Sequence, residues 1–375
     1  MWDQKRYLVG LVALLVILAA CAPTAAPAPA TSTPPPAVET KPAIGPEEAA
    51  WQRVVEVAKK EGTVTVYSQF SGEVALAVTK TFRERTGMVV ENVSGTEAAH
   101  TERVKAERRA GTPMASVMHG SILGMISNKQ DGLLQRIGYL PSLADEAAWI
   151  KSPIYDGEGY IITSALNLGS PWINTKLVKP GEEPRSWRDL LQPQWKGKID
   201  AINPELQIGW VWRMYYYFRK DGLLDDAYFR QLGKQVTWSI NNRASGSKLA
   251  RGEAHIQLML SSVPMGPFVL EGAPVKTIDM EEGLMGIEAE PYTLLDRAPH
   301  PNAARLFVNF ILSKEGQTLF HKHTGSRGLR KDVPDFTPLA GHLSPKRVVW
   351  ATPEGEMEVV KLFQEKTVAK LMKGR

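Results

Sequence analysis

Small polar side chains at the ends of predicted strands are the residues best placed for chemistry in this sequence. Residues 68–72 and 119–121 follow strand-like segments early in the chain, and residues 241–247 and 261–262 follow such segments later. Each group precedes a predicted helix, whose first turn presents free N–H groups and the positive end of the helix dipole. A single loop of this kind more often only caps its helix. Several such loops in one architecture indicate a site for an anion or a polar small molecule.

The motifs of common enzyme classes are absent. The sequence contains no Gly-x-x-x-x-Gly-Lys-Ser/Thr phosphate loop, no Gly-x-Ser-x-Gly nucleophile elbow and no His-Glu-x-x-His zinc motif. Ser245 and Lys248 fit the short pattern Ser-x-x-Lys, but the companion motifs Ser-Asp-Asn and Lys-Thr-Gly are missing. Chance or helix capping explains the pattern better than a catalytic serine, so we predict no catalysis.

Candidate metal ligands are not expected to converge. The seven histidines are scattered, and His321 and His323 would point to different faces of a helix. Tyr215, Tyr216 and Tyr217 are adjacent, and neighbouring residues of a helix diverge by about 100°. We therefore predict no metal and no other cofactor, and we expect these tyrosines to pack between lobes.

The elements that must position the polar loops alternate between strand and helix. This order predicts an α/β fold with mostly parallel strands, in which ligands bind beyond the carboxyl ends of the strands. The predicted strands are 63–67, 88–91, 115–118, 159–168, 198–202, 236–240 and 255–260, and the main predicted helices are 47–61, 97–109, 209–219, 301–312 and 356–373.

The overall composition is that of a globular protein. The chain has 375 residues, of which 43% are hydrophobic and 23% charged, and this length favours two domains. The formal net charge of +5 is small and spread out, which argues against a nucleic-acid binder and is a weak hint toward an anionic solute. The single cysteine excludes a disulfide within the chain.

The first 46 residues differ in composition from the rest. Lys5 and Arg6 precede an apolar run over residues 7–20, which is short for a membrane span and has the form of a signal-peptide core. The run ends in Leu-Ala-Ala-Cys, which resembles the bacterial lipobox and implies cleavage before Cys21 and lipidation of that residue. Residues 22–46 are rich in Pro and Ala and predict an extended tether. We expect an extracytoplasmic protein that a lipid anchors to the membrane.

Several longer stretches have a recognisable pattern, and the most specific are residues 184–199, PRSWRDLLQPQWKGKI, and residues 299–317, PHPNAARLFVNFILSKEGQ. Together these stretches resemble the extracellular solute-binding proteins of bacterial ABC importers, in the branch that includes ferric-iron binders. With further similar segments, the resemblance covers about residues 50 to 335. It implies a type II periplasmic-binding-protein fold, in which two α/β lobes are joined by crossing strands and hinge closure traps the ligand between them. It also implies a membrane permease and a separate ATPase subunit as partners, and we expect a monomer.

The expected layout follows from this resemblance and from the amino-terminal signals. It consists of a signal peptide over 1–20, a lipidated tether over 21–46, lobe 1 over 51–160 and 284–330, lobe 2 over 161–283, and a C-terminal helical segment over 331–375 that packs on the lobes.

The candidate ligand-binding residues come from the strand-end loops of both lobes. Lobe 1 is expected to supply Ser68, Gln69, Ser71, Gly72, Gly120 and Ser121, and lobe 2 to supply Gln207, Gly209, Trp210, Asn242, Arg243, Ser245, Ser261 and Ser262, with Tyr292 closing over the ligand. Arg243 could pair bidentately with an anionic group or remain a solvated loop charge. Trp172 and Trp210 could wall the cleft or pack in the core.

One departure from the family matters for the ligand. The iron binders of this branch carry adjacent tyrosines just after the strand that follows a Gly-Glu turn, whereas here that strand leads to Ser261 and Ser262. Serine hydroxyls suit a carboxylate, a phosphonate or a polyol better than a ferric ion. Three alternatives stay open: an Fe(III)-binding protein that uses other tyrosines, a surface serine hydrolase that works through Ser245 and Lys248, and a sensory module that reports ligand occupancy to a membrane receptor.

Overall fold

The computed structural model describes residues 45–374 except residues 71, 207 and 338–344. The predicted signal peptide, the lipidated Cys21 and nearly all of the tether lie outside the described residues, as do Ser71, Gln207 and the side chain of Ser262. Within the described part of the chain, no helix is both long and apolar enough to cross a bilayer.

The first lobe is built on three parallel strands, in which β1 (Thr63–Ser68) lies between β2 (Val89–Ser94) and β3 (Val117–His119). Its other elements are α1 (Pro46–Glu61), α2 (Gly72–Thr86), α3 (Glu97–Ala110), α4 (Ile122–Gln130), β4 (Leu134–Gln135), α5 (Pro141–Ala144), the 3₁₀ turn η1 (Glu146–Ala148) and, after the chain returns, α10 (Pro301–Leu312), α11 (Lys314–Thr324) and β11 (Arg327–Gly328).

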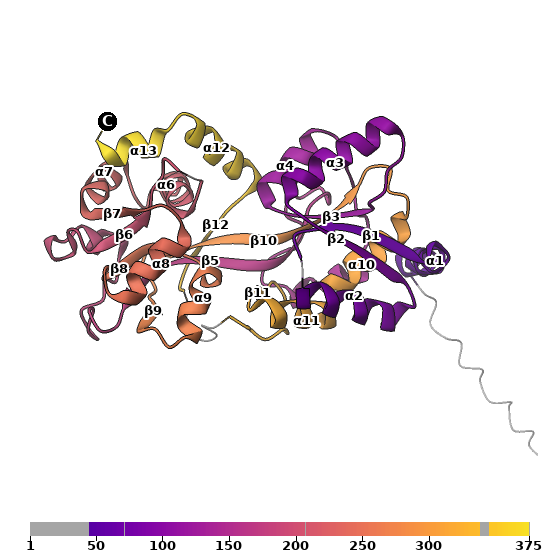
Figure 1. Ribbon diagram of the computed structural model, residues 1–375, viewed down its shortest axis with the longest axis horizontal. Coiled ribbons are helices and arrows are strands. Elements are labelled where there is room, and N and C mark those ends of the chain that lie inside the picture. The colour runs from indigo at the N-terminus through magenta and orange to yellow at the C-terminus, as the bar shows by residue number, and fades with distance from the viewer. Residues whose placement is uncertain (1–44, 71, 207, 338–344, 375) are drawn as a thin grey trace, which may run out of the picture. The chain divides into compact units, whose positions relative to one another are not determined.

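Two long strands join this lobe to the second one. β5 (Ile162–Asn174) and β10 (Leu284–Leu295) pair antiparallel and run across the middle of the molecule in Figure 1. β10 pairs with β3 near its carboxyl end, and β5 pairs with a strand of the second lobe near its own carboxyl end. One continuous sheet path, β2-β1-β3-β10-β5-β8-β6-β7, therefore passes through both lobes.

The second lobe repeats the parallel arrangement, with β6 (Ile199–Ile202) between β7 (Val236–Ser239) and β8 (Ile256–Leu260). Its other elements are η2 (Trp187–Leu191), η3 (Pro193–Trp195), α6 (Trp210–Lys220), α7 (Asp226–Gln235), α8 (Asn242–Arg251), α9 (Ser262–Leu270), β9 (Val275–Thr277), β12 (Val348–Trp350), α12 (Pro353–Gln364) and α13 (Thr367–Lys373). The expectation of mostly parallel strands is therefore confirmed for the outer strands of each lobe, while the crossing strands are antiparallel.

Local sequence explains where several of these elements begin and end. The buried residues Trp51, Val54 and Ala58 recur at helical spacing along α1, and Gly62, with a φ of 72°, ends that helix in the left-handed conformation. Ser186 accepts a hydrogen bond from the backbone of Asp189 while the Asp189 carboxylate accepts one from the backbone of Ser186, which is the predicted capping box.

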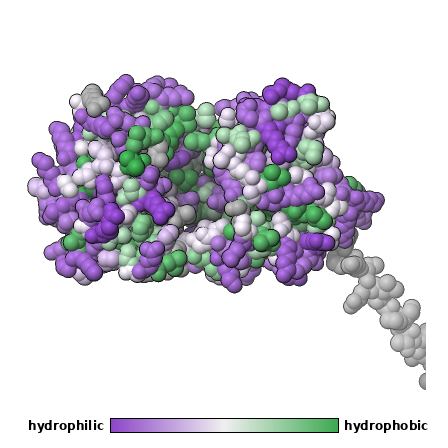
Figure 2. All heavy atoms as spheres, viewed as in Figure 1, coloured by the Kyte–Doolittle hydropathy of each residue, from purple (hydrophilic) through white to green (hydrophobic). Residues whose placement is uncertain are grey.

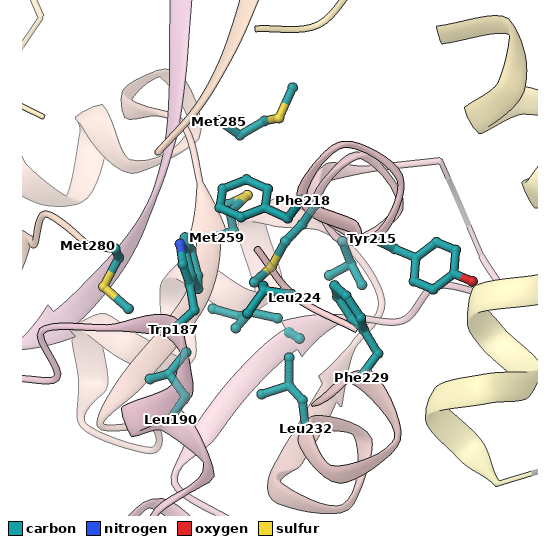
Figure 3. Packing of buried hydrophobic residues seen from close by; sticks show 14 of the residues in the cluster. Trp187, Leu190, Tyr215, Phe218, Leu224, Phe229, Leu232, Met259, Met280 and Met285 are labelled. Atoms are coloured by element: carbon teal, nitrogen blue, oxygen red, sulfur yellow. The ribbon is translucent and has the colours of Figure 1, made fainter. Parts of the chain in front are cut away.

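Each lobe has its own hydrophobic core. Figure 3 shows that of the second lobe, where Trp187 and Phe218 meet edge to face with ring centroids 5.7 Å apart. Tyr215 and Tyr217 belong to this core, so they pack within one lobe rather than between the two. The predicted residue boundaries of the lobes stay a prediction.

The C-terminal segment is two helices rather than the single helix predicted over 356–373. Lys366 adopts a φ of 57°, and this left-handed residue turns the chain between α12 and α13. Val359 of α12 and Met372 of α13 lie in the core of the second lobe.

A buried ion pair fixes α12 to α6. The Arg213 guanidinium donates to both carboxylate oxygens of Glu356, with N···O distances of 2.6 to 3.0 Å, and Glu356 is fully buried. The hydroxyl of Tyr217 lies 3.4 Å from the same carboxylate. Because each charge compensates the other in a desolvated site, loss of one partner leaves the other unpaired.

Glu356→Ala is expected to lower the free energy of unfolding by about 3 kcal/mol, because it leaves the Arg213 charge uncompensated. Urea unfolding followed by circular dichroism measures the change. Glu358→Ala, on the exposed side of the same helix, is the matched control and should change stability by less than about 0.5 kcal/mol. Equal losses in the two variants would contradict a special contribution of the ion pair.

His321 ties α11 to the crossing strand β5. Its ring is fully buried, with Nε2 donating to the Ser164 carbonyl at 3.1 Å and Nδ1 lying 2.7 Å from Ser326 Oγ. Burial lowers the pKa of His321 to about 4, because the imidazolium form would lose its hydration.

The buried histidine makes stability depend on pH in a defined direction. An unfolded histidine titrates near 6.5, so below about pH 6.5 the unfolded chain binds a proton that the folded chain does not bind until about pH 4. This contribution to stability is complete above about pH 6.5 and falls by about 2 kcal/mol as the pH drops from about 6.5 to about 5. His321→Gln should remove this part of the pH dependence of urea unfolding, whereas the exposed His323→Gln should keep it. Parallel pH profiles for wild type and His321→Gln would refute the assignment.

Candidate functional site

The carboxyl ends of strands from both lobes lie against the crossing strands. His119, the last residue of β3, is in register with Tyr292 of β10, and Leu260, the last residue of β8, is in register with Ser170 of β5. The loops that follow β3 and β8 therefore begin beside the same pair of strands. Figure 2 shows a recess between the two lobes over this region.

In the first lobe, the loop after β1 contacts the end of β3. The ring centroids of Phe70 and His119 are 4.0 Å apart. Ser68 is fully buried, and its hydroxyl donates to Asn92 Oδ1 at 2.7 Å while it accepts from the Phe70 N–H at 3.1 Å. Gln69 on the same loop and Gly72, the first residue of α2, are both exposed. The structure thus brings the two predicted loops of this lobe together.

The start of α4 is already occupied by a carboxylate of the protein. Ser121 caps the helix by accepting from the Gly124 N–H at 3.2 Å, and its own N–H donates to the Glu97 carboxylate. A Cβ added at Gly120 or Gly124 would overlap the Glu97 side chain. Glu97 therefore fills the position that an anionic ligand would take at this helix end.

In the second lobe, Ser245 is part of a buried network rather than a free nucleophile. Its hydroxyl is fully buried and donates to Asp200 Oδ2 at 2.5 Å, and Lys248 Nζ lies 2.8 Å from Asp200 Oδ1. The Ser-x-x-Lys spacing thus places both side chains on one interior carboxylate. A catalytic serine needs a hydroxyl that a substrate can reach, and this one is not exposed.

The start of α8 is capped, and its first residues line a groove. Asn241 accepts from the Ala244 N–H at 2.8 Å. Asn242 and the exposed Arg243 lie along a groove of about 720 Å³ between α8 and α9, which Phe268 also lines.

The starts of α6 and α9 differ from those of α4 and α8. Gly209 precedes α6 and Ser261, with 6% of its surface exposed, precedes α9, and neither makes a side-chain capping hydrogen bond. Among the described residues, the N–H groups of these first turns therefore lack the side-chain acceptor of an N-cap. Trp210 packs on Gly169 of β5, where an added Cβ would overlap the indole. Trp172 is fully buried, so of its two predicted roles the structure supports core packing.

Sequence reasoning missed Glu290, which lies on β10 two residues before Tyr292. His119 Nε2 lies 2.6 Å from Glu290 Oε2. Burial opposes ionisation of Glu290, but the hydrogen bond and charge of His119 outweigh it, so the pKa of Glu290 is lowered. Tyr292 itself is fully buried beside His119, with ring centroids 5.0 Å apart. Nothing in the local sequence marks Glu290, because a glutamate in a strand usually faces solvent.

Within residues 45–374, apart from the undescribed positions, no group of three or more His, Cys, Asp or Glu side chains could hold a metal ion. Whether the candidate residues of both lobes contact one solute stays a prediction.

Comparisons with known proteins agree with this architecture. A protein of Salmonella typhimurium, provisionally named as a 2-aminoethylphosphonate-binding periplasmic protein, is 28% identical over 272 residues, which are 70% of this chain and 74% of that protein. A Trichodesmium protein, IdiA or FutA, in complex with iron and citrate has a TM-score of 0.66 at 19% identity, with 83% of this chain and 98% of that chain covered. The periplasmic binding protein AfuA of Actinobacillus pleuropneumoniae, with fructose-6-phosphate bound, has a TM-score of 0.58 at 20% identity, with 81% and 98% covered.

These structural likenesses confirm the predicted type II periplasmic-binding-protein fold. The sequence profile of a family described as bacterial extracellular solute-binding protein matches residues 125–339, which is more than half of the chain. This protein therefore belongs to the bacterial extracellular solute-binding protein family.

Proposed function

We propose that this protein is the solute receptor of an ABC importer, and that it captures a small anionic solute between its lobes for delivery to the permease. The observation that carries the proposal is the pair of uncapped helix starts, at Gly209 and Ser261, that follow strands of the second lobe. Free N–H groups and the positive helix end together favour an oxyanion.

Two helix starts are already occupied by side chains of the protein, and this limits where the anion can bind. The Glu97 carboxylate fills the start of α4, and the Asn241 side chain occupies the start of α8. An anion in the cleft therefore finds unsatisfied donors at α6 and α9. Ser261 adds a hydroxyl that can also donate to it.

The relatives support an oxyanion as the ligand class. The Salmonella protein is named for a phosphonate, and AfuA has a sugar phosphate bound. The Trichodesmium protein holds iron together with citrate, which is a carboxylate. In our chain, Ser261 and Ser262 stand where tyrosine ligands of a ferric ion would be expected, so a simple oxyanion fits better than a metal.

Catalysis is not part of the proposed function. The hydroxyl of Ser245 is buried against Asp200, and the family consists of binding proteins. We also propose that a lipid on Cys21 holds the protein at the outer face of a membrane, because the sole cysteine follows an apolar run at the lipobox position.

A screen by thermal shift should identify the solute class. Phosphonates, sugar phosphates, organic acids and ferric complexes are the compounds to compare, and a solute at 100 times its Kd should stabilise the protein by about 2.7 kcal/mol. Stabilisation by ferric ion alone would contradict the proposal.

Ser261→Asp is expected to weaken binding of the anionic solute at least about tenfold. Aspartate is a good N-cap, so α9 should keep its stability, but its charge repels an anion at the same N–H groups. Calorimetric titration of the solute found in the screen measures the effect. Ser313→Asp, at the capped start of α11, introduces the same charge and should leave the affinity unchanged. If Ser261→Asp also binds as wild type does, α9 is not the anion site.

Cys21→Ser should move the protein from the membrane fraction to the soluble extracytoplasmic fraction, because the acyl anchor is lost. Immunoblots of the two fractions report the distribution. Deletion of residues 27–40, which shortens the tether and keeps Cys21, should leave the protein on the membrane. Retention of Cys21→Ser at the membrane would contradict the lipid anchor.

A further inference from the structure

Glu290 adopts a backbone conformation that is unusual within a strand. Its φ is 52°, and of the three non-glycine residues with positive φ among the described residues, it alone lies in a strand. Its neighbours Ala289 and Pro291 keep their register with β5, so the pairing continues on both sides of Glu290, which is itself not paired. A left-handed non-glycine residue costs about 1 kcal/mol or more, and such strain persists where it positions a functional group.

The conformation places a carboxylate at the junction of the lobes. Its Oε2 is held 2.6 Å from Nε2 of His119, whose side chain is only 2% exposed. The Glu290 side chain is 34% exposed. A buried histidine thus fixes one edge of a carboxylate whose remaining surface reaches solvent.

The surroundings of Glu290 hold its histidine partner in place. The buried rings of Phe70 and Tyr292 lie beside His119, and the ring centroid of Phe70 is 5.1 Å from that of the buried Phe320. These rings therefore support the imidazole and are not themselves exposed. The exposed part of the Glu290 carboxylate remains as an acceptor, and a protonated amine offers it N–H donors.

Charge is also distributed unequally between the lobes. The carboxylates of Glu97 and Glu290 lie at strand ends of the first lobe and on β10, whereas the uncapped helix starts at Gly209 and Ser261 belong to the second. One side of the cleft therefore favours positive charge and the other negative charge.

We propose that Glu290 binds a protonated amine of the solute, so that the protein selects zwitterions that carry an amine and an oxyanion. This assignment rests on the proposed function, since it concerns the same cleft. Glu290 accepts from the ammonium group, His119 positions Glu290, and the oxyanion binds at the starts of α6 and α9.

The test compares solutes that differ only in the amine. The pairs are 2-aminoethylphosphonate with ethylphosphonate, and β-alanine with propionate. Calorimetric titration of wild type should show a preference of about tenfold to a hundredfold for the amine of at least one pair, as expected for one charged hydrogen bond. Glu290→Gln, which keeps the size of the side chain, should lose this preference and retain the affinity for the amine-free compound.

Two further variants keep the test decisive. Glu290→Asp keeps the charge on a shorter side chain, so it should retain more of the preference for the amine than Glu290→Gln does. Glu84→Gln, an exposed position on α2, makes the same change in charge as Glu290→Gln and should keep the wild-type preference.

The outcomes separate this assignment from the proposed function. Equal affinity of wild type for both members of a pair, or a preference that survives in Glu290→Gln, overturns the role of Glu290 and leaves the anion site intact. A wild-type protein that binds neither member of either pair, while a sugar or a ferric complex binds, contradicts the anion site and this assignment together.

Discussion

The antiparallel pairing of β5 with β10 is the contact on which the rest of the structure depends. Its register stays constant from Met285 opposite Gly169 to Tyr292 opposite Ile162, and within this stretch only Glu290 is not paired. Because β3 attaches to one end of this pair and β8 to the other, these strands join the two lobes, which also contact each other where α12 meets α4. Within the crossing, the fully buried Glu288 is paired with Lys151 and accepts from Thr163 at 2.9 Å, which resists sliding of the strands.

The polar groups near the crossing strands fall into two kinds: those that bond to other groups of the protein, and those that a ligand could use. Those in Ser68, Ser245 and the start of α4 bind other protein groups and hold loops in place. In the described part of the chain, the first turns of α6 and α9 have no N-cap side-chain acceptor, and Glu290 on the crossing strand keeps a partly exposed carboxylate. A solute that binds both the helix starts of the second lobe and Glu290 would bridge the lobes. Such bridging would favour the closed form of the hinge.

The sequence predicted the order of elements well, because Gly62 and the Ser186 capping box act locally. It predicted the family from residues 184–199 and 299–317, and the family profile confirms this. It could not separate structural from binding residues, because the partner of Ser245 is Asp200, 45 residues away in the chain. The role of Glu290 depends on its positive φ and on His119, which is 171 residues away, and neither is visible in a local pattern. The break at Lys366 was likewise hidden inside an amphipathic stretch.

The crystal structure of the protein with the solute that co-purifies with it tests the central claim most directly. Our account predicts electron density between the lobes, with an oxyanion at the first turns of α6 and α9 and a nitrogen within hydrogen-bond distance of Glu290. Density for a solute elsewhere, such as in the groove between α8 and α9, would contradict the account, as would a ferric ion held by tyrosines in the cleft.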